Sequence, residues 1–362
     1  MRIYGITIHN VPNFGSVLQA LATQILFSKR DVDYKTIDYY QPRDLLKNRV
    51  KSVLLNAKYP IVKRITVFLT MDILNKYVFS SFLKRRIKLT KRITSLDEIK
   101  GLPKPDIYLT GSDQVWNSSH NQYINSTYYY EGIEGKKVAF ASSFGRSEIP
   151  SKEQSIIRPL LDEYDMISVR EDTGISIINK ILPNKKVEQI LDPTLLIDAN
   201  TWKEYQTHKI ESKKRYILIY PMSGIDYRLF DIANNVAKSV GNCEIWILSP
   251  GIKTYKQCDR TLIFKSPEYF LELIDKAICV VTNSFHGTAF SINFNTPFVS
   301  LMPEKFSTRL QSLLELTNMT TRIWNEKYRY ERVLDIDFTN ANKILNEERK
   351  KADEYITKIL CK

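Results

Sequence analysis

Residues 278–301 read ICVVTNSFHGTAFSINFNTPFVSL, and this stretch carries the clearest signal of the fold class. The apolar and β-branched run at 278–282 predicts a buried strand. A polar turn follows, then a short helix over about 287–294 and, after Pro297, a second strand over 297–301. Because a strand joined through a helix to a neighbouring strand is the unit of parallel α/β sheets, the stretch predicts a doubly wound domain.

The same alternation of strand and helix patterns extends over most of the chain. Other strand-like runs lie at 2–8, 34–38, 106–110, 137–141, 165–169, 187–191, 215–220, 243–248 and 261–264. Helix-like segments between them include 16–28, 152–163, 227–239 and 267–276. The two series predict two doubly wound α/β domains with near-continuous apolar strands. We place these domains at 1–203 and 204–339 and expect a charged helix over 340–362.

The composition is that of an ordinary globular protein. The 362 residues are 43% hydrophobic and 26% charged, a length that two domains account for. Four cysteines without CxxC spacing and four scattered histidines suggest neither a disulfide framework nor a metal site. The chain opens on a strand-like run, and its longest uncharged stretch, 277–303, is interrupted by polar residues. We therefore expect a cytoplasmic protein without a membrane span.

The positive charge is concentrated in one segment. The formal net charge is +13, and residues 43–92 contain 14 Lys and Arg against two acids, Asp44 and Asp72, which is 14 − 2 = +12. Apolar residues alternate with these charges. Three interpretations are open: helices with a solvated face, a surface for an anionic membrane or ligand, or a nucleic-acid surface. Since no nucleic-acid-binding motif is recognisable, we expect no nucleic-acid partner.

Ligands of such sheets bind beyond the carboxyl ends of the strands, and two loops of the first series have suitable residues there. The loop 9–16 is either a plain capping turn or a ligand loop in which a helix N-terminus meets an anion or a sugar. The loop 110–117 presents a carboxylate, an amide and an indole, which suits a sugar; the alternative is an aspartate cap beside a buried tryptophan. The candidates in these loops are Asn13, Gly15, Ser16, Asp113, Gln114, Trp116 and Asn117.

Candidates for binding an anion follow three further strands. Arg146 and Arg170 follow the runs 137–141 and 165–169. Arginine presents a planar fork to carboxylate or phosphate, although each arginine alone is also typical of a surface ion pair. His286 lies at the carboxyl end of a strand and beside a helix N-terminus, where an anion is stabilised and a histidine can donate a proton near neutral pH. Arg309, on the next segment, either adds positive charge there or is a surface residue.

Five motifs together resemble the polysaccharide pyruvyl transferase family. They are Asn13-Phe14-Gly15-Ser16, Gly111-Ser112-Asp113-Gln114-Val115-Trp116-Asn117, Ser168-Val169-Arg170-Glu171, Leu191-Asp192-Pro193-Thr194 and Ser284-Phe285-His286-Gly287-Thr288. The resemblance covers roughly residues 1–320. It implies two facing Rossmann-like domains of the GT-B type with the active site in the cleft between them. It also implies phosphoenolpyruvate as the donor, a sugar of a bacterial surface glycan as the acceptor, and a cyclic pyruvate ketal as the product.

The resemblance also implies roles for individual residues. His286 resembles the family's catalytic histidine and Arg170 a donor-binding arginine; we add Asp113 as a base or acceptor-orienting group. Some members carry an arginine two residues before the histidine, where this chain has Ser284, so other groups must meet the donor's charge. The donor-binding candidates are Arg146, Arg170, Ser284, Phe285, Gly287, Thr288 and Arg309. The acceptor-binding candidates, in the N-terminal domain, are Asn13, Gly15, Ser16, Gln114, Trp116 and Asn117.

Ketal formation requires no metal, so we expect no cofactor beyond phosphoenolpyruvate as co-substrate. The acceptor is a sugar of a polysaccharide precursor, either free or linked to polyprenyl diphosphate. Segment 43–92 is a candidate for docking on the inner face of the cell membrane. Two alternatives remain: a GT-B glycosyltransferase that uses a nucleotide sugar, and a non-catalytic glycan-assembly protein of the same fold.

Overall fold

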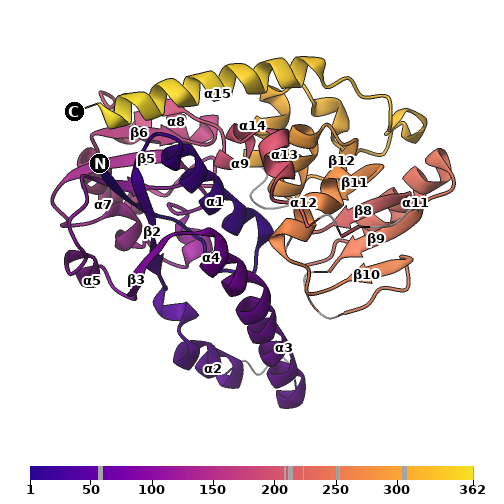
Figure 1. Ribbon diagram of the computed structural model, residues 1–362, viewed down its shortest axis with the longest axis horizontal. Coiled ribbons are helices and arrows are strands. Elements are labelled where there is room, and N and C mark those ends of the chain that lie inside the picture. The colour runs from indigo at the N-terminus through magenta and orange to yellow at the C-terminus, as the bar shows by residue number, and fades with distance from the viewer. Residues whose placement is uncertain are drawn as a thin grey trace. The chain divides into compact units, whose positions relative to one another are not determined.

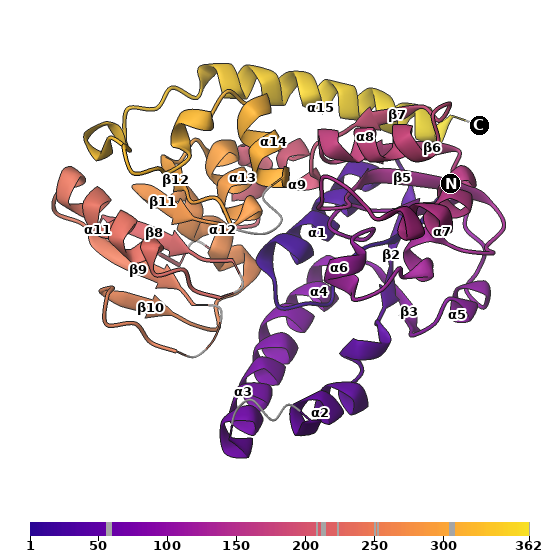
Figure 2. The same ribbon diagram turned by 180° about the vertical axis from the view of Figure 1, so that it is seen from behind.

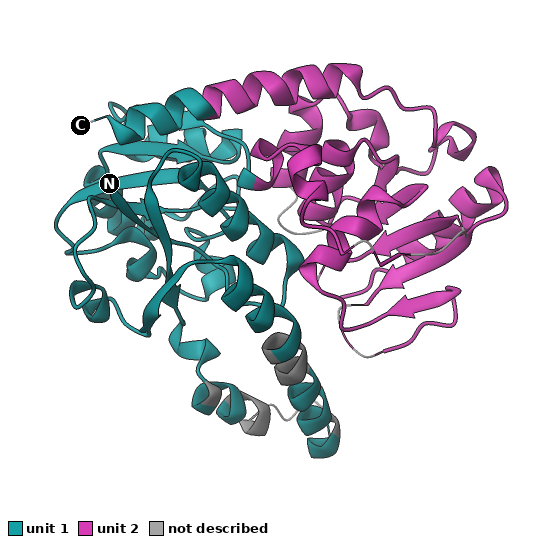
Figure 3. Cartoon of the chain, viewed as in Figure 1, with its two compact units in different colours: residues 1–193, 353–362 teal, residues 194–352 magenta. Residues whose placement is uncertain are grey.

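The computed structural model describes residues 1–55, 60–207, 209–210, 215–222, 224–249, 251, 253–303 and 308–361, without the side chains of 46, 52–55, 63 and 71–76. The chain divides into two compact units. Unit 1 comprises Met1–Pro193 and Asp353–Lys362, and unit 2 comprises Thr194–Ala352 (Figure 3).

Unit 1 is built on a 7-stranded parallel sheet with the strand order β3-β2-β1-β4-β5-β6-β7 (Figure 1). Its strands are β1 (Arg2–Ile6), β2 (Asp33–Tyr39), β3 (Leu89–Ile93), β4 (Ile107–Thr110), β5 (Lys136–Ser142), β6 (Met166–Val169) and β7 (Val187–Gln189). Its helices are α1 (Phe14–Ser28), α2 (Leu46–Leu55), α3 (Ile61–Ile73), α4 (Ser80–Arg86), α5 (Asp97–Lys100), α6 (Ser118–Asn121), α7 (Ser151–Asp162) and α8 (Asp172–Ile181). Shorter turns are η1 (Pro42–Asp44), the π-helical η2 (Leu74–Phe79) and η3 (Ser126–Tyr129).

Unit 2 contains a 5-stranded parallel sheet with the order β10-β9-β8-β11-β12. Its strands are β8 (Tyr216–Tyr220), β9 (Glu244–Leu248), β10 (Arg260–Leu262), β11 (Cys279–Thr282) and β12 (Phe298–Ser300). Its helices are α10 (Ala199–Lys203), α11 (Arg228–Val240), α12 (Pro267–Asp275), α13 (Phe285–Phe294) and α14 (Thr308–Leu316), with the short η4 (Thr320–Arg322) and η5 (Tyr330–Arg332). The helix α9 (Pro193–Leu196) begins at the junction of the units, and α15 (Thr339–Leu360) begins in unit 2 and ends in unit 1.

The central strands of both sheets are apolar and buried. Every residue of β4, β8 and β11 is buried, as is typical of parallel sheets. The prediction of two parallel α/β domains is therefore confirmed. The edge strand β3 was not predicted, because its sequence LTKRI is charged and only Ile93 is buried. Helix α13 begins at Phe285 rather than at 287, since Ser284 caps it.

Residues 194–203 belong to unit 2, although the sequence places the boundary after 203. The side-chain amide of Asn293 donates hydrogen bonds to the carbonyls of Thr194 and Ile197, at 3.0 and 2.8 Å. The Trp202 ring packs edge-on against Phe290, 5.4 Å between centroids. These contacts attach the segment to α13, the central helix of unit 2.

The basic segment 43–92 forms η1, α2, α3, η2, α4 and β3, apart from 56–59, which lie outside the described residues. Figures 1 and 2 show α2 and α3 reaching beyond the sheet of unit 1, whereas α4 lies against that unit. Within the described ranges, no helix combines the length and the apolar character needed to span a membrane.

Candidate active site

The turn after β4 holds Asp113 in an unusual backbone conformation. Its φ is 70°, in the left-handed region that residues other than glycine rarely adopt. A β-bridge to Ser142 and a hydrogen bond of 3.1 Å from the Ser143 N–H to the Asp113 carbonyl hold this backbone in place. Such conformations cost about 1–3 kcal/mol and cluster at functional sites. The conformation is thus a second reason, besides the sequence motif, to place function at Asp113.

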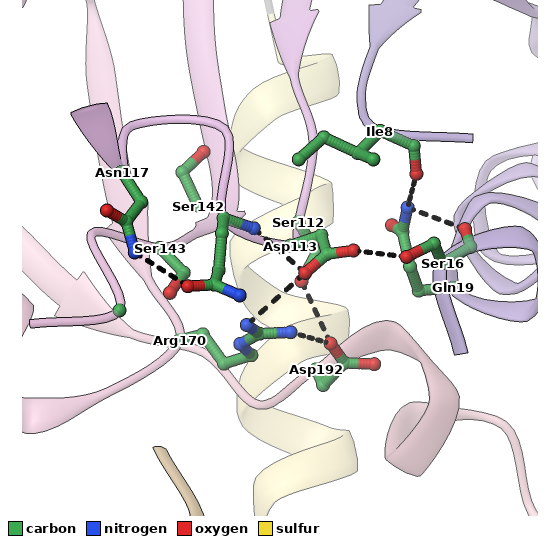
Figure 4. A network of polar contacts seen from close by, with 12 residues as sticks. Ile8, Ser16, Gln19, Ser112, Asp113, Asn117, Ser142, Ser143, Arg170 and Asp192 are labelled. Carbon is green, nitrogen blue, oxygen red and sulfur yellow. Dashed lines mark hydrogen bonds and ion pairs between the residues drawn. The ribbon is translucent and has the colours of Figure 1, made fainter. Parts of the chain in front are cut away.

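Both carboxylate oxygens of Asp113 accept hydrogen bonds (Figure 4). The Ser16 hydroxyl donates to Oδ2 at 2.6 Å, and the Gln114 N–H donates to Oδ1 at 2.9 Å. Ser16 lies in the first turn of α1, where its N–H donates to the capping side chain of Asn13 at 3.1 Å. Gly15, between them, is buried. The predicted loops after β1 and β4 therefore meet at the carboxyl edge of the sheet of unit 1.

Arg170, directly after β6, is enclosed by carboxylates. Its Nη1 lies 2.5 Å from Asp192 Oδ2, its Nη2 lies 3.8 Å from Asp113 Oδ1, and its Nε lies 3.8 Å from Glu171 Oε2. The side chains of all four are almost fully buried. Burial lowers the pKa of the Arg170 guanidinium, but the three carboxylates raise it by more, so its pKa lies above the ordinary value. Arg170 is therefore a permanent cation within this cluster.

The neighbouring hydroxyl groups complete the Arg170 cluster. Ser112 Oγ donates to Asp192 at 3.0 Å, while Ser143 Oγ donates to Glu171 at 2.7 Å. Because the guanidinium is enclosed by carboxylates of its own unit, the geometry favours a role in orienting them. The assignment of Arg170 to donor binding stays a prediction.

Arg146 is the second predicted arginine of unit 1, and it forms an ion pair near the surface. Its Nη2 lies 2.6 Å from Glu153 Oε2 and donates to Ser118 Oγ at 2.9 Å. Nη1 donates to Ser119 Oγ at 3.2 Å. This arrangement matches the alternative interpretation of Arg146 as an ordinary ion-pair former.

The remaining acceptor-side candidates have structural partners. Asn117 Nδ2 donates to Gln114 Oε1 at 2.6 Å, and Asn117 Oδ1 caps α6. The pair packs closely against Gly145, where a Cβ would lie 2.4 Å from Gln114 Oε1 and φ is 62°. Trp116 is buried and stacks on Tyr129, 5.5 Å between centroids. The geometry thus favours the alternative that Trp116 belongs to the core, and its role in acceptor binding stays a prediction.

A buried histidine and aspartate at the ends of β1 and β2 were not predicted as a pair. His9 Nε2 lies 3.3 Å from Asp38 Oδ1, and Arg92 Nε donates to Asp38 Oδ2 at 3.2 Å. Burial raises the pKa of the Asp38 carboxyl, but His9 and Arg92 lower it by more, so Asp38 is an anion. His9 follows the predicted strand 2–8 and Asp38 is the last residue of the predicted strand 34–38, but the sequence gives no sign that their side chains meet.

In unit 2, His286 occupies the first turn of α13, which follows β11. Ser284 is the N-cap, with its hydroxyl accepting a hydrogen bond from the Gly287 N–H at 3.4 Å. The Thr282 hydroxyl donates to the Tyr220 carbonyl at 2.5 Å and accepts from the Ser284 N–H at 3.0 Å. These hydrogen bonds fix the turn that precedes His286. The His286 residue is 6% exposed.

Gly287 allows α13 to approach the sheet closely. A Cβ at this position would lie 2.5 Å from Thr282 Oγ1 and 2.8 Å from Tyr220 Cδ1. One residue on, the Thr288 and Ser300 hydroxyl groups are 2.7 Å apart and tie α13 to β12. Gly287 and Thr288 therefore position the helix that bears His286.

Phe285 contacts both His286 and Arg309. Its ring meets the imidazole edge-on at 5.1 Å between centroids, and the Arg309 guanidinium lies 5.7 Å from its centroid. Arg309, from α14, is buried. Near the same turn, burial raises the pKa of the Tyr220 phenol, and the hydrogen bond of this phenol with Ser284 lowers the pKa by a smaller amount. The predicted donor-side residues of unit 2 thus gather at the N-terminus of α13, where a cation and a dipole both favour an anion.

Comparison with known proteins bears on this geometry. A sequence model of the family described as polysaccharide pyruvyl transferase matches residues 13–304. The chain belongs to this family. The match contains Asp113, Arg170 and His286 but not Arg309, which follows it. No curated protein has a significantly similar sequence.

Solved structures resemble this pyruvyl transferase family member in fold. The UDP-GlcNAc 2-epimerase of Neisseria meningitidis, bound to UDP-GlcNAc, is 13% identical over 99% of each chain, with a TM-score of 0.52. The UDP-GlcNAc 2-epimerase of Methanocaldococcus jannaschii is 13% identical over 99% of each chain, with a TM-score of 0.44. UGT89C1 of Arabidopsis thaliana, complexed with quercetin, is 11% identical over 97% of this chain and 94% of its own, with a TM-score of 0.48. The expected GT-B type of fold, with two Rossmann-like domains, is confirmed.

Within this family member, Asp192 and Glu171 lie beside Arg170 and were not predicted as candidates from the sequence. Both belong to motifs that carry the family resemblance, and Glu171 follows Arg170 directly. Their signal in the sequence was position, since 187–191 and 165–169 were both predicted strands. Among the described residues, no group of three or more His, Cys, Asp and Glu side chains is placed to hold a metal ion.

Proposed function

We propose that this protein transfers the pyruvyl group of phosphoenolpyruvate to a sugar of a surface-polysaccharide precursor and forms a pyruvate ketal. Membership of the family supports polysaccharide pyruvylation as the class of reaction. The observation that carries the finer proposal is His286 in the first turn of α13, with Phe285 against its ring and Arg309 beside Phe285. In this proposal the His286 imidazole supplies the proton to phosphoenolpyruvate, and the N-terminus of α13 stabilises its negative charge.

The proposed reaction begins with a proton from His286 to the methylene carbon of phosphoenolpyruvate. C2 becomes electrophilic, and one sugar hydroxyl attacks it and loses its proton. The bond from C2 to the phosphate oxygen breaks, inorganic phosphate leaves, and a second hydroxyl closes the ring and loses its proton. Two hydroxyl protons are lost; one balances the hydrogen gained at the methylene carbon, and the other leaves with the phosphate. General acid help of this kind contributes about 10²–10⁴ in rate.

Other residues receive supporting roles in this proposal. Arg309 and the N–H groups at the start of α13 meet the negative charge of phosphoenolpyruvate. They take the place of the arginine that some family members carry where this chain has Ser284. Asp113 orients or deprotonates the acceptor hydroxyl, with Arg170 and Ser16 holding its carboxylate. An acceptor linked to polyprenyl diphosphate requires the enzyme to work at a membrane surface, and the proposal includes the inner face of the cell membrane as that surface.

The test is incubation with phosphoenolpyruvate and a panel of lipid-linked and free sugars, following product mass and phosphate release. A product heavier by one pyruvate less one water, formed with one equivalent of phosphate, is the expected result. His286→Asn should abolish it, whereas His120→Asn, an exposed histidine of unit 1, should not. Ketal formation that persists in His286→Asn would contradict the assigned acid.

The GT-B type of fold is also that of glycosyltransferases, so nucleotide sugars form the second arm of the test. Sugar transfer with release of a nucleoside diphosphate, and no use of phosphoenolpyruvate, would replace the proposal. A protein that binds the glycan but is inert with both donors would instead be a non-catalytic assembly protein.

A further inference from the structure

Helix α3 carries an apolar stripe that is open to solvent. Ile61, Val62, Ile65 and Leu69 are 45%, 72%, 43% and 53% exposed. Residues 61, 65 and 69 are four apart, and 62 lies next to them, so these side chains share one face of the helix. Single exposed apolar residues are ordinary, but a contiguous apolar stripe marks an interaction surface.

The neighbouring elements hold this stripe away from the core of unit 1. Phe79 and Phe82, at the far end of the continuous run from α3 through η2 to α4, are buried, and the Phe79 ring lies 5.1 Å from Phe14. Figures 1 and 2 show α2 and α3 extending beyond the sheet from this anchor. Arg49 of α2 lies over the Phe68 ring of α3, 5.1 Å from its centroid. The hydrophobic core of unit 1 is therefore formed by other side chains, and the stripe of α3 is not part of it.

The neighbouring helix α2 carries exposed positive charge. Lys47 and Lys51 of α2 are exposed, as is Val50 between them at 38%. The whole segment 43–92 has 14 basic and two acidic residues. We name seven of the exposed residues of these two helices the α2–α3 surface: Lys47, Val50, Lys51, Ile61, Val62, Ile65 and Leu69. Its chemistry pairs an aliphatic face with cations.

We propose that the α2–α3 surface binds an anionic lipid bilayer, with the stripe of α3 among the acyl chains and the lysines at the lipid phosphates. An amphipathic helix with a basic flank lies in the plane of such an interface, and both contributions strengthen binding. The inference deepens the membrane location given under Proposed function, but it rests on the surface alone and not on the transferred group.

Charge decides between lipid and the other possible occupants. A second copy of the chain would bring the same excess of 14 − 2 positive charges against this one, and like charges would repel. A nucleic acid would complement the lysines, but its phosphates would leave the aliphatic stripe in water. A bilayer with anionic headgroups satisfies both features at once.

The test is flotation of the full chain with vesicles of phosphatidylcholine and phosphatidylglycerol, and with vesicles of phosphatidylcholine alone. The wild type should float with the anionic vesicles. Lys47→Gln with Lys51→Gln should weaken partition roughly 30-fold, since each lysine near an anionic surface contributes about fivefold. Ile65→Ser with Leu69→Ser should weaken it at least about tenfold through the lost apolar burial.

A matched control comes from α7, another exposed helix of unit 1. Ile156 is 47% exposed there, and Lys152 and Arg158 of the same helix are exposed as well. The triple change Ile156→Ser, Lys152→Gln and Arg158→Gln should leave flotation as in the wild type. All the substituted side chains are exposed, so thermal unfolding of each variant should match the wild type and will reveal any that misfolds.

Four results would overturn the proposal. Three of them concern flotation: the wild type fails to float at low salt, Ile65→Ser with Leu69→Ser floats as the wild type does, or the α7 control loses as much flotation as the α2–α3 variants. The fourth is a dimer in sedimentation that these serine changes dissociate, with no binding to vesicles. Transfer to a free sugar without vesicles should be unchanged in the α2–α3 variants. If no protein transfers pyruvyl groups, the proposed function fails while flotation still decides the membrane proposal.

Discussion

Replacement of Arg170 by methionine should destabilise unit 1 far more than the same replacement of Arg146. The Arg170 side chain is 2% exposed and lies 2.5 Å from Asp192 Oδ2, with Asp113 and Glu171 each 3.8 Å away. Removal of one partner of a buried ion pair costs about 3–5 kcal/mol, because the remaining charge stays buried without compensation. Three carboxylates remain here, so we expect about 4–5 kcal/mol, the upper half of that range.

Arg146→Met provides the comparison. The Arg146 and Glu153 side chains are 17% and 23% exposed, and one carboxylate rather than three remains. Ion pairs in contact with solvent contribute about 1 kcal/mol or less. A double variant, Arg170→Met with Asp192→Asn, should recover at least about 1 kcal/mol of the Arg170→Met loss, since it removes one of the carboxylates left uncompensated.

The assay is urea unfolding followed by hydrogen exchange and mass spectrometry, which separates peptides of unit 1 from those of unit 2. Loss of protection in Arg170→Met should be confined to unit 1. Equal losses for Arg170→Met and Arg146→Met would refute the reasoning. So would an Arg170→Met protein of wild-type stability whose sole change is weaker binding of phosphoenolpyruvate, because Arg170 would then act on the donor.

Three further predictions concern unit 2 and the thiols. Gly287→Ala should destabilise unit 2 by about 1–3 kcal/mol through overpacking. Gly251→Ala should be neutral in the same unfolding assay, because among the described residues no atom apart from its chain neighbours lies within 4 Å of the new Cβ. Burial raises the pKa of the Glu272 carboxyl, but hydrogen bonds to the carboxylate lower this pKa by more, from 4.5 to about 2. The stabilisation by Glu272 is therefore complete above about pH 4.5 and is lost as the pH falls through 2. Glu272→Gln should flatten this acid limb of stability in thermal unfolding, and an unchanged limb would contradict the assignment. Burial raises the pKa of the Cys279 thiol to about 12. At pH 8 a thiol reagent should therefore label the exposed Cys361 and leave Cys279 unlabelled until the protein unfolds. Equal labelling rates of the two cysteines would contradict the burial of Cys279.

The fold was predictable because its strands are apolar and its turns are chemically distinct. The run 278–282 is followed by a Ser, Asn and Gly turn, and the structure places β11, the N-cap Ser284 and α13 there. Strand β3 escaped prediction because an edge strand with one buried residue has no apolar pattern to detect. For segment 43–92 helices were one of three open interpretations, and their bounds were not predicted because much of their apolar surface faces solvent.

The site was predictable only in part. Strand ends located Asp113, Arg170 and His286, because the carboxyl edge of a parallel sheet is where loops carry function. The partners of these residues are set by tertiary packing: Asp192 meets Arg170 from the next strand, and Ser16 meets Asp113 from α1. No local pattern distinguishes a tryptophan that stacks on a sugar from one that stacks on Tyr129, as Trp116 does.

The passage of α15 from one unit to the other has a consequence for biosynthesis. Tyr355 lies in the part of α15 that belongs to unit 1, where its hydroxyl donates to the Ala139 carbonyl at 3.0 Å and its ring stacks on Phe140. On the ribosome, every residue of unit 2 is translated before this tyrosine emerges. Unit 1 is thus translated first but completed last. Until the end of α15 has been made, the backbone around β5 lacks the segment that packs against it.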